Sequence, residues 1–148
     1  MKVYALHTTT YKWQQLPDLN FARSNHGSTC LGDAVFVVGG YDTPFNYINS
    51  IERLKMGANH AEESQTWSLI DIQQLTPRFY PVLSQIGPDE LCILGGHNSD
   101  YKKVSDGFIL NVKTLTVTKI NPASQIKFVS YSESFMKTYG LLLSLVHD

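Results

Sequence analysis

The sequence predicts an all-β fold in which a unit of four short strands repeats about every 55 residues. Short runs rich in Val, Ile, Leu, Tyr and Trp alternate with turn residues, and no long segment keeps the apolar spacing of a helix. Three pairs of landmarks carry the repeat: Gly39–Gly40 and Gly95–Gly96 at a shift of 56, Arg23 and Arg78 at a shift of 55, and Trp13 and Trp67 at a shift of 54.

We name the four expected strands of each period a, b, c and d in chain order. In the first period they are His26–Gly32, Ala34–Gly40, Asn49–Met56 and Thr66–Ile72. In the second period they are Tyr80–Ile86, Glu90–Gly96, Ser105–Val112 and Leu115–Ile120. The polar segment 57–65 is expected to be a long loop between strands c and d. Four short strands in each period are the signature of a β-propeller blade.

Strand b is a continuous apolar run in both periods, which is typical of a strand covered on both faces. Each copy ends in two glycines, Gly39–Gly40 and Gly95–Gly96. Glycine allows a positive φ and leaves room for another backbone, so we expect a sharp corner with a close contact there. A glycine pair without GxxxxGK or GxGxxG before a helix does not indicate a nucleotide site.

The first period resembles the kelch-repeat family. The resemblance rests on the double glycine after strand b, Glu52 in "NSIERL", Trp67 on strand d and the Arg-x-x-His of "ARSNH". The second period keeps Arg78 and the glycines but lacks the His, Glu and Trp, and Thr116 or Val117 stands near the Trp position. The resemblance covers nearly the whole chain and implies a kelch-like β-propeller. Another repeated all-β fold is the alternative.

The repeats divide the single expected domain, 1–148, into two whole blades and two half blades. Residues 1–20 would supply strands c and d of a split blade, 21–75 and 76–121 are the whole blades, and 122–148 would supply strands a and b. In the last part, Tyr139–Gly140 is expected to be the turn and Leu141–Val146 strand b.

These parts amount to about three blades of four-stranded antiparallel sheet, whereas closed propellers have roughly four to eight. The chain is therefore predicted to be a partial propeller or half of a closed ring. More chain, a second copy or another subunit would complete it. Uncovered outer strands would expose the apolar side chains of Val3, Tyr4, Leu6, Leu142, Leu143, Leu145 and Val146.

Composition excludes several classes of function. Apolar residues make up 43% of the chain, the formal net charge is −1 and no basic stripe is visible, so nucleic acid is not an expected partner. The run Leu141–Val146 is too short to cross a bilayer, and the N-terminus lacks the apolar core of a signal peptide, so we expect a cytoplasmic protein without membrane contact. Cys30 and Cys92 have no metal spacing and are expected to be buried, reduced thiols.

In kelch proteins that bind partners, the loops between strands b and c and the segments leading into strand a form the contact surface, and the resemblance implies the same here. The first blade then offers Ser24, Asn25, Tyr41, Asp42, Phe45, Asn46 and Tyr47. The second offers Phe79, Tyr80, His97, Asn98, Asp100 and Tyr101. These aromatic and polar residues suit recognition, although such rings can equally pack the loops.

Arg23 and Arg78 have two interpretations. As a ring of guanidinium groups they could bind a carboxylate of a partner in bidentate fashion. As structural residues they would bond to loop carbonyls or to an acid such as Glu52, and their repetition at one blade position favours this second interpretation.

The leading functional prediction is a non-enzymatic module or scaffold that binds a protein or peptide. The alternatives are an enzyme acting on a small polar substrate at the disc centre, with carboxylates such as Asp42 and Asp100, and an architectural subunit of a larger assembly. The five histidines are scattered and no Ser–His–Asp arrangement is visible, so we expect no metal, no cofactor and no catalytic residue.

Overall fold

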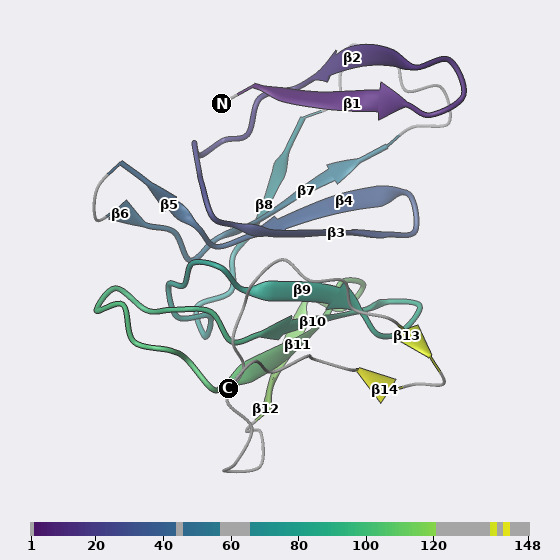
Figure 1. Ribbon diagram of the computed structural model, residues 1–148. Helices are drawn as coiled ribbons and strands as arrows, with labels where there is room; N and C mark the ends of the chain where they lie inside the picture. Colours follow the sequence, from purple (N-terminus) through teal and green to yellow (C-terminus); the bar gives the residue numbers. More distant parts are fainter. Residues whose placement is uncertain (1, 44–45, 57–65, 121–136, 139–140, 143–148) are drawn as a thin grey trace.

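The computed structural model describes residues 2–43, 46–56, 66–120, 137–138 and 141–142, and every regular element within these ranges is a β-strand. Two four-stranded antiparallel sheets form its centre (Figure 1). The first, blade 1, contains β3 (Gly27–Leu31), β4 (Ala34–Val38), β7 (Ile51–Lys55) and β8 (Ser68–Ile70). The second, blade 2, contains β9 (Val82–Gln85), β10 (Glu90–Leu94), β11 (Gly107–Asn111) and β12 (Thr116–Ile120).

Both sheets keep the chain order of their strands, as in a propeller blade. The predicted strands a to d are therefore confirmed in both periods, with bounds shorter by a few residues. The expected loop at 57–65 lies outside the described residues.

The registers of the two blades are equivalent. Val35 faces Leu54 in blade 1, and one repeat later Leu91 faces Leu110 in blade 2. Leu110 also faces Val117, so Val117 takes the place that Trp67 has in blade 1. Valine on this pleated surface fills less space than an indole, which explains why the second repeat is harder to detect in the sequence.

Three two-stranded sheets accompany the blades, one in the loop after β4 and one toward each end of the chain. β1 (Val3–His7) and β2 (Lys12–Leu16) form the N-terminal hairpin, and β13 (Lys137–Thr138) pairs with β14 (Leu141–Leu142) near the other end of the chain. Within the described ranges, neither hairpin shares a sheet with the other. The predicted turn at 139–140 and the continuation of strand b beyond Leu142 lie outside the described residues. That the two hairpins are halves of a split blade stays a prediction.

Successive sheets lie face to face (Figure 1). Apolar side chains fill the space between them. Leu16 and Leu19 of the N-terminal segment pack with Val37, Leu54 and Trp67 of blade 1. The opposite face of blade 1 packs against blade 2 in a larger cluster that contains Phe36, Val38, Ile51, Ile70, Leu83, Leu91, Ile93, Phe108 and Leu110. Each sheet is thus covered on the side where a neighbouring sheet stands, as the blade arrangement requires.

The double-glycine corners bring successive blades together. Gly39 and Gly40 have φ values of 66° and 89°, and the N–H of Gly40 donates to the carbonyl of Arg78, at the start of blade 2, over 2.8 Å. A Cβ on Gly40 would lie 2.5 Å from the carbonyl oxygen of Ser24, closer than a side chain can approach. The expectation that these glycines admit another backbone is confirmed.

Cys30 is exposed, so the expectation that both cysteines are buried is wrong for this residue, whereas Cys92 is buried. Ser28 and Cys30 face Val37 and Val35 in register and therefore share the face of blade 1 that packs on the N-terminal hairpin. That hairpin has only two strands, and its apolar contacts reach Val37 but not the outer part of β3. A two-stranded sheet covers only part of this face, which leaves the thiol of Cys30 in solvent.

Candidate functional site

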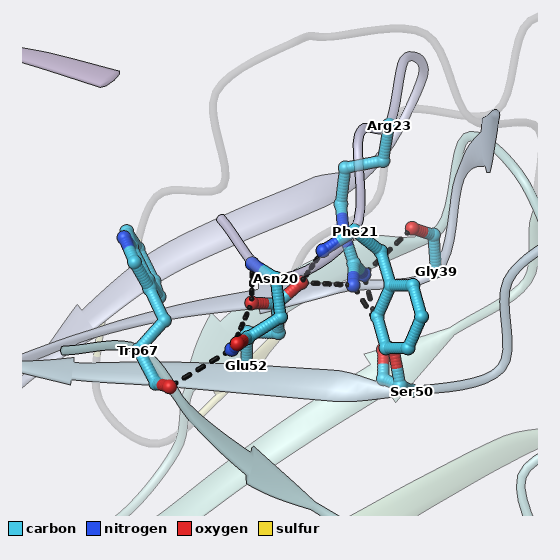
Figure 2. A network of polar contacts seen from close by, with 7 residues as sticks. All are labelled: Asn20, Phe21, Arg23, Gly39, Ser50, Glu52 and Trp67. Atoms are coloured by element: carbon cyan, nitrogen blue, oxygen red, sulfur yellow. Dashed lines mark hydrogen bonds and ion pairs between the residues drawn. The ribbon is translucent and has the colours of Figure 1, made fainter. Parts of the chain in front are cut away.

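Arg23 is bonded inside blade 1 (Figure 2). Its guanidinium donates to the carbonyl oxygens of Gly39 at 3.0 Å and Ser50 at 3.1 Å, and forms an ion pair of 2.5 Å with Glu52. Both charged side chains are fully buried. Desolvation lowers the pKa of Arg23, and the charge of Glu52 opposes that shift. The arginine therefore closes the corner between strands b and c.

Glu52 also holds the segment that leads into blade 1 (Figure 2). Its carboxylate accepts the backbone N–H of Asn20 at 2.7 Å, the side-chain amide of Asn20 at 2.9 Å and the N–H of Phe21 at 3.2 Å. The Asn20 amide donates in turn to the carbonyl of Trp67, and the Trp67 indole N–H donates to the carbonyl of Pro17. One buried carboxylate thereby joins strands c and d to the preceding chain.

In blade 2, different residues bond the corner between strands b and c. Arg78 donates to the carbonyl of Gly95 at 3.2 Å and to the carboxylate of Asp106 at 3.0 Å. Its guanidinium carbon lies 5.0 Å from the centre of the Phe108 ring, in a cation–π arrangement. Two further N–H groups donate to the hydroxyl and carbonyl of Thr76. Burial lowers the pKa of Arg78, while Asp106 acts in the opposite direction.

The acid has changed position between the blades. Phe108 of blade 2 takes the place of Glu52, and Asp106 takes the place of Ser50, at equivalent points in strand c and its approach. The arginine is kept, and its acidic partner comes from two positions earlier in the chain. Arg23 and Arg78 are only 2% and 0% exposed, so their bonding within the blades matches the structural interpretation of these residues.

The loops after strand b and the segments before strand a gather six rings from both blades. We call this set the aromatic cluster: Tyr41, Tyr47, Phe79, Tyr80, His97 and Tyr101. Phe79 is its centre, only 4% exposed, with the other five ring centroids 5.4–5.7 Å away. Tyr80 and Tyr101 form its outer surface, at 43% and 64% exposed.

Backbone pairing brings these rings together. Short strands β5 (Tyr41–Asp42) and β6 (Asn46–Tyr47) form a small hairpin within the first loop, which the sequence did not predict. Isolated bridges pair Ser24 with Tyr41 in blade 1, and Phe79 with His97 in blade 2. Because Ser24 and Phe79 occupy equivalent positions, both blades use one backbone scheme to join the loop to the segment before strand a.

The turns that precede strand a also match. Asn25 and Tyr80 stand at equivalent places in the two repeats and have φ values of 55° and 54°, an uncommon conformation for residues with a side chain. The Asn25 amide donates to the Tyr41 hydroxyl at 2.8 Å, and the N–H of Tyr80 donates to the carbonyl of Asn25 at 2.7 Å. The second blade is therefore bonded directly to the loops of the first.

Polar groups border the aromatic cluster. A hydrogen bond with Tyr101 is the main cause that raises the pKa of Tyr47 to about 12, with desolvation and the nearby Tyr41 and Asp100 adding to it. Burial and the neighbouring charge of Lys103 lower the pKa of His97, which favours its neutral form. The surface around the rings thus offers the Tyr47 hydroxyl and a neutral imidazole at neutral pH.

The other predicted site residues lie around this cluster. Ser24, Asn46 and Asp100 are exposed, while Asn25, Asp42 and Asn98 are half-buried. The side chain of Asn98 accepts the backbone N–H groups of Asp100 and Lys102, both at 3.0 Å, and so shapes the second loop. Phe45 lies outside the described residues. Sequence reasoning could name these residues but not the central role of Phe79.

The described ranges contain no group of three or more His, Cys, Asp or Glu residues close enough to hold a metal ion. They also contain no helix that is long and apolar enough to span a membrane.

Comparison with protein families gives one match, to the kelch motif, over residues 22–70. No curated protein matches the chain. The kelch match covers β3 to β8 and the buried pair of Arg23 and Glu52. Blade 2 lies beyond it, yet repeats its strand order and register, so the fold is that of a partial, kelch-like β-propeller.

Proposed function

We propose that the chain is a non-enzymatic kelch module that binds a protein or peptide segment through the aromatic cluster. One observation carries the proposal: six rings from two blades meet on the loops, with a buried phenylalanine beneath partly exposed tyrosines. Kelch motifs generally belong to interaction modules, which supports this class of function.

The arrangement suits recognition because its exposed rings rest on a rigid support. Tyr80 packs on Phe79 at 5.4 Å, and Tyr101 packs on the same ring edge to face at 5.4 Å. Rings held in this way lose little further freedom on binding, and tyrosine offers both apolar area and a hydroxyl. We infer that a few of these rings supply most of the affinity.

The partner's chemistry follows from the groups at the border. Asp42 and Asp100 stand beside the rings, whereas the two recurring arginines, Arg23 and Arg78, are occupied inside the blades. We therefore propose a segment that places apolar or aromatic side chains on Tyr80 and Tyr101 and a basic side chain near the two carboxylates.

The test selects peptides from a random display library against the intact protein and measures their dissociation constants by fluorescence polarisation. We expect Tyr101→Ala to weaken binding about tenfold to a hundredfold, in the range of interface hot spots. Tyr11→Ala is the matched control, since Tyr11 is 78% exposed and, like Tyr101, has a positive φ, but lies in the N-terminal hairpin. Equal affinity of the peptides for both variants and for the unaltered protein would refute the proposal.

We also propose that another blade covers the outer face of the N-terminal hairpin. Leu6 faces Trp13 in register, and both are exposed, at 41% and 68%. The equivalent residues of blade 1, Leu54 and Trp67, are buried against the preceding segment. More of the chain in a longer protein, a second copy or another subunit would complete the disc.

Light scattering of the purified chain separates these ways of completing the disc. A mass of two chains, reduced to one by Trp13→Glu, would support a ring closed by a second copy. A single-chain mass, with Trp13 exposed to solvent, would exclude closure by a second copy. The disc would then be completed by further chain or by another subunit. If Trp13 is shielded in a single chain, covering by a separate blade is refuted.

The two cysteines favour a reducing compartment such as the cytoplasm. Both are free, and Cys30 is exposed. An exposed free thiol is readily oxidised in a secretory compartment, so we propose a cytoplasmic location. Fluorescence microscopy of the tagged protein tests this, and exclusive staining of a secretory organelle would contradict it.

A further inference from the structure

A pocket of about 290 Å³ lies between blade 1 and blade 2, away from the aromatic cluster. It is formed by the turn between β3 and β4, by β7 and by the turn between β9 and β10. Figure 1 shows the β3–β4 turn at the opposite edge of blade 1 from β5 and β6. Leu31, Phe36 and Val112 supply apolar walls, and Arg53 supplies a guanidinium group.

Arg53 is placed by the register of the sheet. It faces Phe36 across β4 and β7, so both side chains lie on the face of blade 1 that packs on blade 2. Its Nε atom is buried and has no hydrogen-bond partner. None of the ion pairs found among the described residues includes Arg53. A buried donor without a partner is costly, and the same side chain lines the wall of the pocket.

Arg53 also differs from the arginines that build the fold. Arg23 and Arg78 recur at one blade position and bond to carbonyls and acids, whereas Ile109 takes the place of Arg53 in blade 2. An arginine needed to build every blade would recur in the second one. This arginine breaks the repeat at the wall of a pocket, which points to a ligand.

The charge of the pocket limits the ligand. Arg53 and Lys55 line it together with Asp33 and Asp89, so the formal charges of these four side chains cancel. Lys55 and Asp33 pair with each other at 3.8 Å and are well exposed at the mouth. The two carboxylates of the pocket would repel a polyanion such as a phosphate ester. A ligand with a single carboxylate carries less charge and can bind the planar guanidinium in bidentate fashion.

We propose that this pocket binds a small monocarboxylate with a short aliphatic body. The carboxylate accepts hydrogen bonds from Arg53, and the aliphatic body packs on Leu31, Phe36 and Val112. The volume, just below the usual range of small-molecule pockets, suits a ligand of this size. This site is independent of the proposed binding surface, which stands on other residues.

The experiment titrates 4-methylpentanoate into the ¹⁵N-labelled intact chain and follows amide chemical shifts. The neutral probe 4-methylpentanamide has the same shape without the charge. We expect saturable shifts at the amides of Ala34, Phe36 and Val112 with the carboxylate, and at least about tenfold weaker binding of the amide. Equal binding of the two probes, or shifts that do not saturate, would overturn the proposal.

Substitutions then test the arginine. Arg53→Met should weaken binding of 4-methylpentanoate about tenfold or more, whereas Lys102→Met, which removes an exposed cation outside the pocket, should not change it. Arg53→Lys keeps the charge and loses the planar fork, so it tests the same contact if the methionine variant does not fold. Unchanged affinity in a folded Arg53 variant refutes the site.

Discussion

Replacement of Glu52 by glutamine should strongly destabilise the fold. The Glu52 carboxylate is fully buried and accepts four hydrogen bonds, one of them from the buried guanidinium of Arg23. Glutamine keeps the size of the side chain but leaves the charge of Arg23 without a counter-charge. Breaking a buried ion pair on one side costs about 3–5 kcal/mol in the free energy of unfolding.

This cost can be measured by urea unfolding followed through tryptophan fluorescence. Trp67 is 6% exposed and Trp13 is 68% exposed, so the change in emission on unfolding reports mainly on Trp67, which is bonded into the network of Glu52. We expect a lower midpoint at unchanged slope, and a melting temperature reduced by about 6–20 °C at the roughly 2–4 °C per kcal/mol of a chain this size.

Asp106→Asn is the matched control in blade 2. The Asp106 side chain is 20% exposed, and Arg78 keeps Thr76, Gly95 and the Phe108 ring when the charge is lost. We expect a smaller cost of about 1–3 kcal/mol. If Glu52→Gln costs less than about 1 kcal/mol, or less than Asp106→Asn, the buried pair does not hold blade 1 as we argue.

Three further expectations test burial at single positions. Trp67→Phe should lower the free energy of unfolding by about 1–3 kcal/mol, because indole volume and a hydrogen bond are lost. Trp13→Phe, at the matching register, should change it by no more than about 0.5 kcal/mol, since Trp13 is exposed. Equal urea midpoints of the two variants would contradict this. A thiol reagent at neutral pH should modify the exposed Cys30 in the native protein. It should modify Cys92 only in denaturant, because burial raises the pKa of the Cys92 thiol to about 11. Fast modification of both thiols in the native protein would contradict this expectation. Burial and the neighbouring Arg23 guanidinium lower the pKa of His26 in the folded state. The contribution of His26 to stability is therefore complete above the unfolded-state pKa of about 6.5 and is lost as the pH falls. His26→Gln should make the melting temperature fall less steeply below that pH, and an unchanged pH profile would argue against this.

The strands and the glycine corners could be predicted because their signals are local. Continuous apolar runs mark strand b, and Gly39–Gly40 marks a corner where a side chain would strike the next backbone. The match to the kelch motif, over residues 22–70, includes β4 and this first corner.

The features that the sequence hid depend on contacts between distant segments. In the sequence, Phe79 is one aromatic residue among many. Its backbone pairing with His97 in the loop after strand b makes it the centre of the aromatic cluster. The sequence predicts a buried Cys30 because free cysteines in strands are usually buried. Its exposure follows from a neighbouring sheet that is only two strands wide. The exchange of Glu52 for Asp106 was hidden because the acid changes strand position while its arginine does not.

The contacts of Arg78 with Thr76 have a consequence for the order in which the two blades assemble. In blade 1 the corner is fastened across 31 and 32 residues, from Glu52 back to Phe21 and Asn20, so strand c must already be in place. In blade 2 the arginine also bonds to Gly95 and Asp106, 17 and 28 residues away, but its bonds to Thr76 span only two residues. Such a short loop closes at little entropic cost. We therefore expect the start of the second blade to form early as a local turn, onto which the first blade can then dock its glycine corner.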